Sequence, residues 1–215
     1  MKKMACIIMA GGKSTRFDYS QINCPYHEKP LLPIKNNFMI DIILEQILPI
    51  QSLEPIIIAT SPNTPNTTQI LSRRKNSQFI IVETPGKNYH EDSQFVIKKY
   101  QLHETMIITA DLPTISTSLL QQAIGAFWAA NKPAFSVMIE IPIVQEFDPI
   151  LLSPENIYTT PDGHQYYPIP INFIDGHHIE EIYIEQGIWV VSDKRLLYNI
   201  NRIEDYNRYL QDFQQ

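Results

Sequence analysis

Two glycines and two cations stand close together near the start of the chain, directly after a short apolar run. Gly11 and Gly12 follow residues 5–10, and Lys13 and Arg16 come next. Glycine lets backbone N–H groups approach an anion without a Cβ atom in the way, and the cations add positive charge. The spacing therefore predicts a phosphate-binding loop. The alternative is a tight strand-to-helix turn that binds no ligand.

The better-known phosphate-binding motifs do not match this loop. The segment Gly12-Lys13-Ser14 imitates the end of a Walker A motif, but that motif requires a glycine where Ile7 stands. A dinucleotide-binding G-x-G-x-x-G motif fails as well, because Lys13 and Thr15 occupy positions that need glycine. Both of these nucleotide-binding classes are therefore excluded.

Asp111 is a second candidate for chemistry. It directly follows the apolar run 106–110, so we expect its carboxylate at the carboxyl edge of a strand, where open α/β sheets bind ligands. One carboxylate can hold Mg²⁺ when substrate phosphates and water complete the coordination. The alternative is structural, because Asp111-Leu112-Pro113 would also form a turn or a helix cap.

The elements that must position these residues alternate between short apolar runs and longer helix-like segments. We expect strands at 5–10, 55–60, 78–82, 105–110 and 134–139, and helices at 38–48, 67–74, 91–101 and 116–130. In the first helix, apolar residues recur with helical spacing and predict a face that packs on the sheet. This alternation predicts the α/β class, with a doubly wound, mostly parallel, Rossmann-like sheet.

The pattern changes after residue 139. Residues 141–174 contain several of the 16 prolines and predict irregular chain or short antiparallel strands, as part of an elaboration that extends to about residue 190. Residues 179–191 resemble one more strand. Asn201 and Glu204 have the spacing of a capping box and predict a final helix that ends near residue 213.

Composition narrows the class of protein. At 215 residues we expect a single domain over 1–215, and a net charge of −6 argues against a nucleic-acid partner. No apolar run approaches the ~20 residues of a membrane-spanning helix. Two cysteines make no disulfide framework, so we expect a reducing compartment, the cytoplasm.

Two motifs together resemble the signature of a known enzyme superfamily. The loop at 10–16 matches the pattern A-G-G-x-[ST]-x-R, with Ser14 at the Ser/Thr position, and E-K-P-L-L follows at 28–32. This combination resembles the nucleotidyltransferases that move an NMP unit from an NTP and release pyrophosphate. Enzymes of molybdenum-cofactor and sugar metabolism share it, so it indicates the reaction class only. Lys29 of the second motif adds a cation to the expected phosphate site. The alternative is that Lys13 and Lys29 are solvated surface residues.

Later segments are similar to one family, the archaeal GTP:adenosylcobinamide-phosphate guanylyltransferases of cobamide synthesis. The most specific are A-T-S-P-N-T-P at 59–65 and G-K-x-Y-x-E-D at 86–92, and further matches follow at 110–112, 187–191 and 199–205. The resemblance implies transfer of GMP from GTP to adenosylcobinamide phosphate with Mg²⁺ as cofactor. A nucleotidyltransferase with a molybdopterin or phosphosugar acceptor, and a nucleotide-binding module without turnover, remain as alternatives.

The resemblance also implies roles for individual residues. Arg16, Lys29 and Asp111 would be catalytic, and Asp111 would also hold Mg²⁺. The residues implied in nucleotide binding are Ala10, Gly11, Gly12, Lys13, Ser14, Thr15, Ser61, Asn63, Glu83, Gly187 and Asn201. Two of these have structural alternatives, since Asn201 can cap a helix and Gly187 can mark a β-bulge.

Glu83 is the candidate for recognition of the base. It follows the apolar run 79–82 and precedes the segment 84–87, where the family has an acidic residue before its T-x-G-K. Guanine presents a ring N–H and an amine side by side, and one carboxylate can accept both, whereas adenine offers no such pair. The alternative is an exposed glutamate at the end of a strand.

Two segments depart from the family pattern. Residues 17–27 are several residues longer than expected and show no apolar periodicity, so we expect a mobile segment that orders over the triphosphate. Residues 142–174 are longer and richer in proline, and an acceptor would bind there. Cys24 with His27, and His177 with His178, lack a second ligand pair and are expected on the surface rather than at a zinc site.

Overall fold

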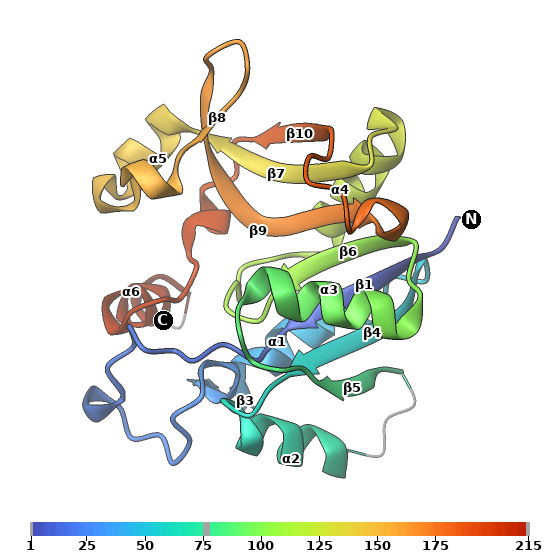
Figure 1. Cartoon of the computed structure of the whole chain (residues 1–215). Helices are drawn as coiled ribbons and strands as arrows, with labels where there is room; N and C mark the ends of the chain where they lie inside the picture. Colours follow the sequence, from blue (N-terminus) through green and yellow to red (C-terminus); the bar gives the residue numbers. More distant parts are fainter. Residues whose placement is uncertain (1, 75–77, 214–215) are drawn as a thin grey trace.

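An eight-stranded sheet runs through the molecule in this computed structural model, which describes residues 2–74 and 78–213 (Figure 1). The strands stand in the order β10-β7-β9-β6-β1-β4-β5, and β8 pairs with β9 outside this path. A separate small sheet pairs β2 with β3. The bounds are β1 Met4–Met9, β2 Pro33–Ile34, β3 Asn37–Phe38, β4 Leu53–Thr60, β5 Ile80–Glu83, β6 Glu104–Thr109, β7 Ala134–Glu140, β8 Tyr158–Thr159, β9 Gln165–Asp175 and β10 Gln186–Val191.

The three central strands are parallel and buried on both faces. Ile7 of β1 stands in register with Ile57 of β4 and Ile107 of β6, and the next residue of each strand is again an isoleucine. Successive side chains of a strand point to opposite faces, so the two rows of isoleucines pack in two different clusters. Burial on both faces explains why these strands are continuous apolar runs rather than alternating ones. The α/β class and the mostly parallel sheet are confirmed.

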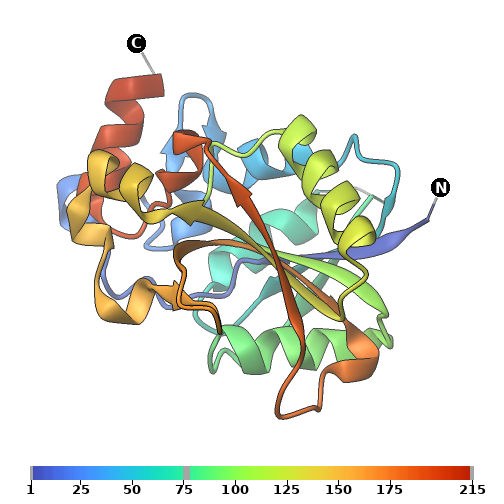
Figure 2. The same ribbon diagram turned by 90° about the horizontal axis from the view of Figure 1, so that it is seen from above.

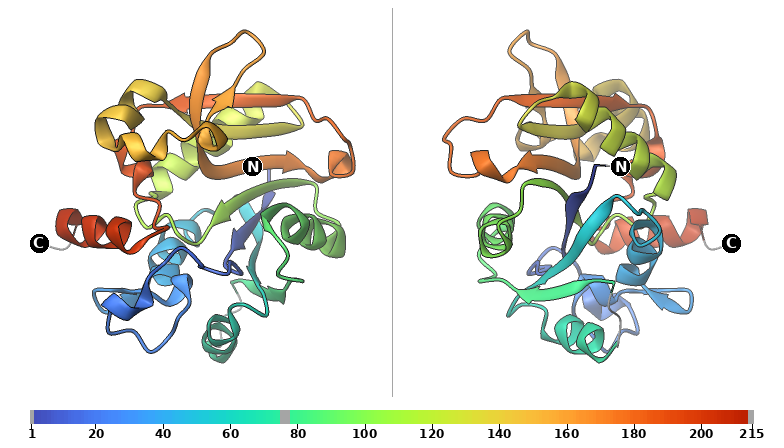
Figure 3. Two further views of the ribbon diagram at one scale, coloured as in Figure 1. Left: turned by 60° about the vertical axis from the view of Figure 1, so that its left-hand side comes forward. Right: turned by 90° about the vertical axis from the view of Figure 1, so that its right-hand side faces the viewer.

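The helices cover the two faces unequally. Buried side chains of α1, α2, α4 and α5 join one cluster, whereas α3 is the helix that contributes to the cluster on the other face in the described residues. Figure 3 shows α3 on one side of the sheet and α4 on the other. No helix in the described ranges is long and apolar enough to cross a bilayer. The bounds are α1 Met39–Ile47, α2 Pro65–Arg73, α3 Tyr89–Tyr100, α4 Thr117–Ala130, α5 Ile141–Phe147 and α6 Ile203–Phe213.

The proline-rich segment contains a long central strand that the sequence did not predict. β9 has 11 residues and lies antiparallel between β6 and β7, so it belongs to the main sheet. Proline lacks a backbone N–H and is tolerated in a sheet at irregularities. Pro168 pairs with Met138 where the β7–β9 register shifts, next to Pro170. The antiparallel direction was predicted correctly, whereas the strand expected at 179–191 begins only at Gln186.

Residues 17–27 pack against the last helix, which corrects the expectation that this segment has nothing to pack. Phe17 is buried in a third cluster with Tyr206 and Tyr209 of α6, and Ile22 packs against the same cluster. The spacing of these apolar residues follows neither a helix nor a strand, so periodicity could not reveal it. The segment is therefore anchored beside Arg16 and connects the first loop to the C-terminal helix.

Candidate active site

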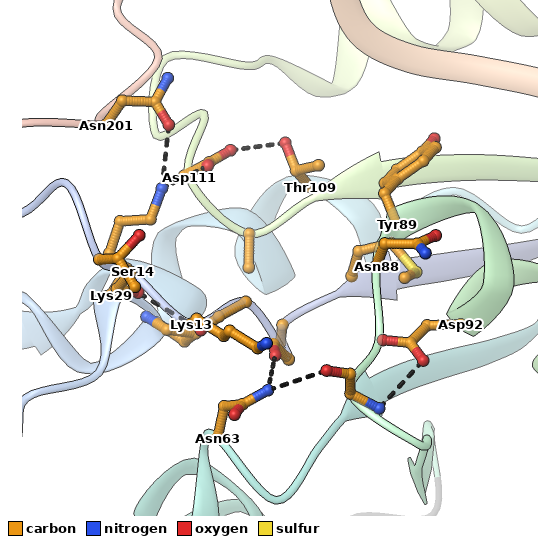
Figure 4. Close-up of a pocket in the computed structure, with 18 of the residues that line it drawn as sticks. Lys13, Ser14, Lys29, Asn63, Asn88, Tyr89, Asp92, Thr109, Asp111 and Asn201 are labelled. Atoms are coloured by element: carbon orange, nitrogen blue, oxygen red, sulfur yellow. Dashed lines mark hydrogen bonds and ion pairs between the residues drawn. The ribbon is translucent and has the colours of Figure 1, made fainter.

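A cavity of about 370 Å³ opens at the carboxyl ends of β1 and β6 (Figure 4). This volume lies within the range of small-molecule binding sites. The cavity brings together most of the residues that the sequence singled out. Those that line it are Ala10, Gly11, Gly12, Lys13, Ser14, Thr15, Arg16, Lys29, Asn63, Asp111 and Asn201.

The first loop packs closely on the end of β4. A Cβ atom on Gly11 would lie 2.9 Å from Ser61 Cβ and 3.1 Å from the carbonyl carbon of Thr60, so only glycine fits. Ser61 Oγ donates a hydrogen bond to the Gly11 carbonyl at 2.7 Å. Ser61 is fully buried and does not line the cavity. Its effect on a nucleotide is therefore indirect, through the position of the loop.

Asn63 joins the first loop to the loop that follows β5. Its Nδ2 donates to the carbonyls of Gly11 at 3.4 Å and Gly86 at 3.3 Å, as Figure 4 shows. Gly86 has φ +71°, and the buried Asp92 carboxylate accepts hydrogen bonds from the backbone N–H groups of Gly86 and Lys87. In the described part of the chain nothing donates to Asn63 Oδ1. This oxygen therefore remains available as an acceptor for a ligand.

Lys29 lies at the opposite side of the cavity among three oxygen atoms. Its Nζ is 2.7 Å from Asp111 Oδ2, 2.9 Å from the Ile200 carbonyl oxygen and 3.2 Å from Asn201 Oδ1. Thr109 Oγ1 donates to the other Asp111 oxygen at 2.5 Å. The Lys29 and Asp111 side chains are 13% and 16% exposed, so their attraction is only partly screened by water. The three side chains of this cluster, Lys29, Asp111 and Asn201, face the cavity.

The Asn201 side chain contacts residues of the cavity and does not cap the final helix. Its Oδ1 accepts hydrogen bonds from Lys29 Nζ and, at 3.1 Å, from Arg16 Nη2. Asp205 Oδ2 instead accepts from the backbone N–H groups of Asn201 and Arg202, ahead of α6. The predicted capping box of Asn201 and Glu204 is therefore wrong, and the capping carboxylate is one residue further on.

Glu28 is a positioning residue whose role the sequence did not predict. It is 3% exposed, and its Oε1 accepts from the N and Nδ2 of Asn66, while its Oε2 accepts from the N and Oγ1 of Thr67. These groups lie in the first turn of α2, where a carboxylate is favoured by the helix dipole. Glu28 therefore holds the segment before Lys29 against α2. The only sequence signal was its place in the E-K-P motif.

Besides Ser61, two further predicted residues do not reach the cavity. Glu83 ends β5 with an exposed side chain, and because Val82 faces α3, its neighbour points to the opposite face of the sheet. Gly187 lies in β10 next to β7, where a Cβ atom would meet the Phe135 ring at 2.8 Å. Close packing explains this glycine. The alternative prediction, that Gly187 marks a β-bulge, is also wrong, because the β7–β10 register is regular.

The donor set at Asp111 suits a hard cation. Mg²⁺ prefers oxygen ligands, and the carboxylate, the Asn201 amide and the Ile200 carbonyl already surround the Lys29 ammonium. No group of three or more His, Cys, Asp or Glu residues with metal-binding geometry occurs among the described residues. Phosphate oxygens and water would therefore have to complete the coordination.

A glycine loop at the end of the first strand, with cations and one carboxylate at the switch point of an α/β sheet, is suited to bind the phosphates of a nucleotide. The MobA-like NTP transferase domain matches residues 6–151, and the chain belongs to this family. An adenosylcobinamide-phosphate guanylyltransferase of Methanocaldococcus jannaschii is 28% identical over 211 residues, which cover 94% of this chain and 93% of that protein. The resemblance found from the motifs is thereby confirmed.

Solved structures share the fold at low sequence identity. The 4-diphosphocytidyl-2C-methyl-D-erythritol synthase of Anaerococcus prevotii has a TM-score of 0.66 and 12% identity, with coverage of 100% of this chain and 97% of that chain. HddC of Yersinia pseudotuberculosis has a TM-score of 0.67 and 15% identity, with coverage of 98% and 99%. These similarities support the nucleotidyltransferase fold and carry no information on substrates.

Proposed function

We propose that the chain transfers GMP from GTP to adenosylcobinamide phosphate and releases pyrophosphate. The observation that carries this proposal is the similarity to the Methanocaldococcus jannaschii protein over 94% of the chain. The MobA-like match ends at residue 151, whereas this similarity extends into the C-terminal part. Nucleotidyltransferases differ in nucleotide and in acceptor, and similarity beyond the shared domain supports the same acceptor.

The cavity residues account for binding of the triphosphate. Lys13 is exposed on the first loop and forms no ion pair within residues 2–74 and 78–213, so its charge is available to a ligand. Arg16 and the backbone N–H groups of Gly11 and Gly12 lie beside it. Cations and loop amides together are the groups that bind nucleotide phosphates in such folds. In this proposal they hold the β- and γ-phosphates.

Lys29 is suited to act at the α-phosphate. An acceptor phosphate oxygen forms a bond to the α-phosphorus, and the bond from the α-phosphorus to the bridging oxygen breaks, so that pyrophosphate leaves with the electron pair. Two anions must approach each other in this step, and catalysis consists of positioning and charge neutralisation. Lys29 can exchange its contact with Asp111 for a phosphate oxygen without moving far. Asp111 and Asn201 would hold Mg²⁺, which when bound neutralises charge on the phosphates.

Asn63 is the residue that we assign to the base. Its Nδ2 is engaged by backbone carbonyls of both loops, which fixes the amide and leaves Oδ1 as an oriented acceptor. Guanine offers two adjacent donors, so an acceptor at this position favours guanine over adenine. This assignment replaces Glu83, whose side chain lies outside the cavity. Both cysteines are buried, which corrects the surface position expected for Cys24, and they form no disulfide, which agrees with a reaction in the cytoplasm.

A substrate panel tests the proposal. Pyrophosphate release is measured with GTP or CTP and Mg²⁺ in combination with adenosylcobinamide phosphate, molybdopterin or a sugar 1-phosphate. We expect release with GTP and the corrinoid only. Release with molybdopterin or the sugar phosphate would assign another acceptor. GTP binding without release for any acceptor would instead support a nucleotide-binding module.

A further inference from the structure

A chain of four polar side chains leads away from the active-site cavity, across the sheet. Gln186 Nε2 donates to Ser136 Oγ at 2.6 Å, Ser136 Oγ donates to Asn172 Oδ1 at 2.7 Å, and Asn172 Nδ2 donates to Tyr89 Oη at 3.1 Å. We call these four residues the polar relay. Tyr89 lines the active-site cavity, and Gln186 lines a second hollow bordered by α3 and residues 179–184. The relay therefore connects the two hollows.

The relay lies on a part of the sheet that α3 does not cover. Ser136, Asn172 and Gln186 belong to β7, β9 and β10, whereas α3 packs against the central strands. Figure 2 shows α3 and α4 on opposite sides of the sheet, and in Figure 1 β9 and β6 separate β7 and β10 from α3. Their opposite face is covered, because Phe135 and Phe173 pack in the same cluster as α4. This face of β7, β9 and β10 carries hydrogen-bonding side chains, and because Ser136 is buried, the relay reaches the two hollows at its ends, Tyr89 and Gln186.

The hydrogen bonds of the relay run in a single direction. Each side chain donates to the next one toward Tyr89, so the Tyr89 hydroxyl proton is the donor left over at the cavity end. A tyrosine hydroxyl is protonated at neutral pH, and desolvation raises the pKa of Tyr89 further, to about 12. At the other end, Gln186 Oε1 receives no hydrogen bond from the described residues. The relay thus presents a donor at one end and an acceptor at the other.

The second hollow is lined by polar and apolar side chains, and its two glutamates are already in ion pairs, Glu180 with Lys98 and Glu181 with His178. Ile182 is fully exposed and Tyr183 is 78% exposed, and Ile182 and Ile184 line the hollow. Lys98 is the lysine of this hollow, and its Nζ lies 2.7 Å from Glu180 Oε1. The phosphate-binding cations are therefore confined to the first cavity. The second hollow suits a ligand part that is neutral, partly apolar and rich in hydrogen-bonding groups.

We propose that the polar relay and the adjoining hollow bind the body of the acceptor substrate and select one that carries neutral amide or hydroxyl groups on an apolar framework. This inference rests on the proposed function, because the phosphate of the acceptor must reach Lys29 while its remainder extends past Tyr89. A corrinoid with carboxamide groups around its ring has this chemistry. A sugar phosphate lacks the apolar framework.

Steady-state kinetics of two relay variants test the inference. Asn172→Ala breaks the middle of the relay and Gln186→Ala removes its far end, and Gln165→Ala is the control, because Gln165 is an exposed residue of β9 outside the relay. We expect a KM for the corrinoid acceptor about 5- to 30-fold higher in both relay variants, since loss of a hydrogen-bond partner costs about 1–2 kcal/mol. The Kd for GTP and the kinetics of Gln165→Ala are expected to stay within about twofold of the original protein.

The outcomes separate this inference from the proposed function. An unchanged acceptor KM in both variants, or a parallel loss of GTP affinity, would overturn the assignment of the relay. If the original protein turns over another acceptor of the panel instead, the proposed function fails, and the same KM comparison is made with that acceptor. A raised KM for that acceptor would then support acceptor binding at the relay and would correct the class of acceptor. If Asn172→Ala does not fold, Gln186→Ala alone decides, because Gln186 lies at the edge strand.

Discussion

Lys29 Nζ lies 2.7 Å from Asp111 Oδ2, although 82 positions separate the two residues in the chain. The contact joins the E-K-P segment to the carboxyl end of β6, and Asn201 completes it from the segment before α6. Three parts of the chain therefore meet at one cation. In the proposed reaction this is the point at which the two substrates must approach each other.

Asp111→Asn should keep the fold and lower turnover by at least about 100-fold. The amide preserves the size of the side chain and an acceptor for Thr109, but it removes the charge that holds Lys29 and would hold Mg²⁺. Removal of a single electrostatic contact in an active site typically costs about 10²–10³ in rate. Pyrophosphate release and thermal unfolding are measured in parallel, with the exposed Asp162→Asn as control. Near-normal turnover of a folded Asp111→Asn protein would exclude the catalytic role.

Glu28→Gln should destabilise the protein by about 1.5–3 kcal/mol, because one carboxylate oxygen becomes an amide that faces donors of Asn66 or Thr67. Denaturant unfolding measures the change in the free energy of unfolding. Glu83→Gln makes the same chemical change at an exposed position and should leave this free energy unchanged within about 0.5 kcal/mol. Equal stability of the two variants would contradict the capping role of Glu28.

Asn63→Ala should weaken GTP binding by about 5- to 150-fold and narrow its advantage over ATP, because an oriented acceptor is lost together with the link between two loops. Calorimetric titrations with GTP and ATP give both affinities. The Glu83→Gln variant should bind both nucleotides like the original protein, since its side chain lies outside the cavity. The reverse pattern, with loss in Glu83→Gln alone, would restore the assignment made from the sequence.

Phe17→Ala should lower the free energy of unfolding by about 3–5 kcal/mol, because the ring is 6% exposed and packs against α6. The exposed Ile150→Ala is the control. Because Arg16 precedes Phe17, we also expect weaker GTP binding in the destabilised variant. A loss of stability below about 1 kcal/mol would show that residues 17–27 are a surface loop without a structural role.

The central part of the fold could be predicted because its pattern is local. Continuous apolar runs such as 105–110 indicate buried parallel strands, and the glycine loop and Asp111 follow two of them directly. β9 was missed because prolines normally exclude a central strand, and only the register shift beside Pro168 makes room for them. That shift depends on a partner strand that is distant in the sequence.

The candidate site was predicted where a residue follows a strand and missed where a contact is long-range. Glu83 lies at the end of a strand, where successive side chains point to opposite faces of the sheet, and its side chain points away from the cavity. The sequence locates a strand end only to within about one residue, so it could not show which face Glu83 occupies. Glu28 and the relay residue Asn172 are distinguished by contacts with α2 and α3, which are distant in the sequence. Composition and spacing contain no signal for such contacts.

Transfer of label from GTP to the acceptor tests the central claim most directly. GTP labelled at the α-phosphate is incubated with Mg²⁺, adenosylcobinamide phosphate and the protein. The products are separated, and their masses are determined by mass spectrometry. The proposal predicts that the label moves into a corrinoid product heavier by one GMP unit, with pyrophosphate released in equal amount, and that Asp111→Asn forms almost none. Label that remains in GTP, or that appears in GDP or free GMP while the corrinoid stays unmodified, would contradict the proposal.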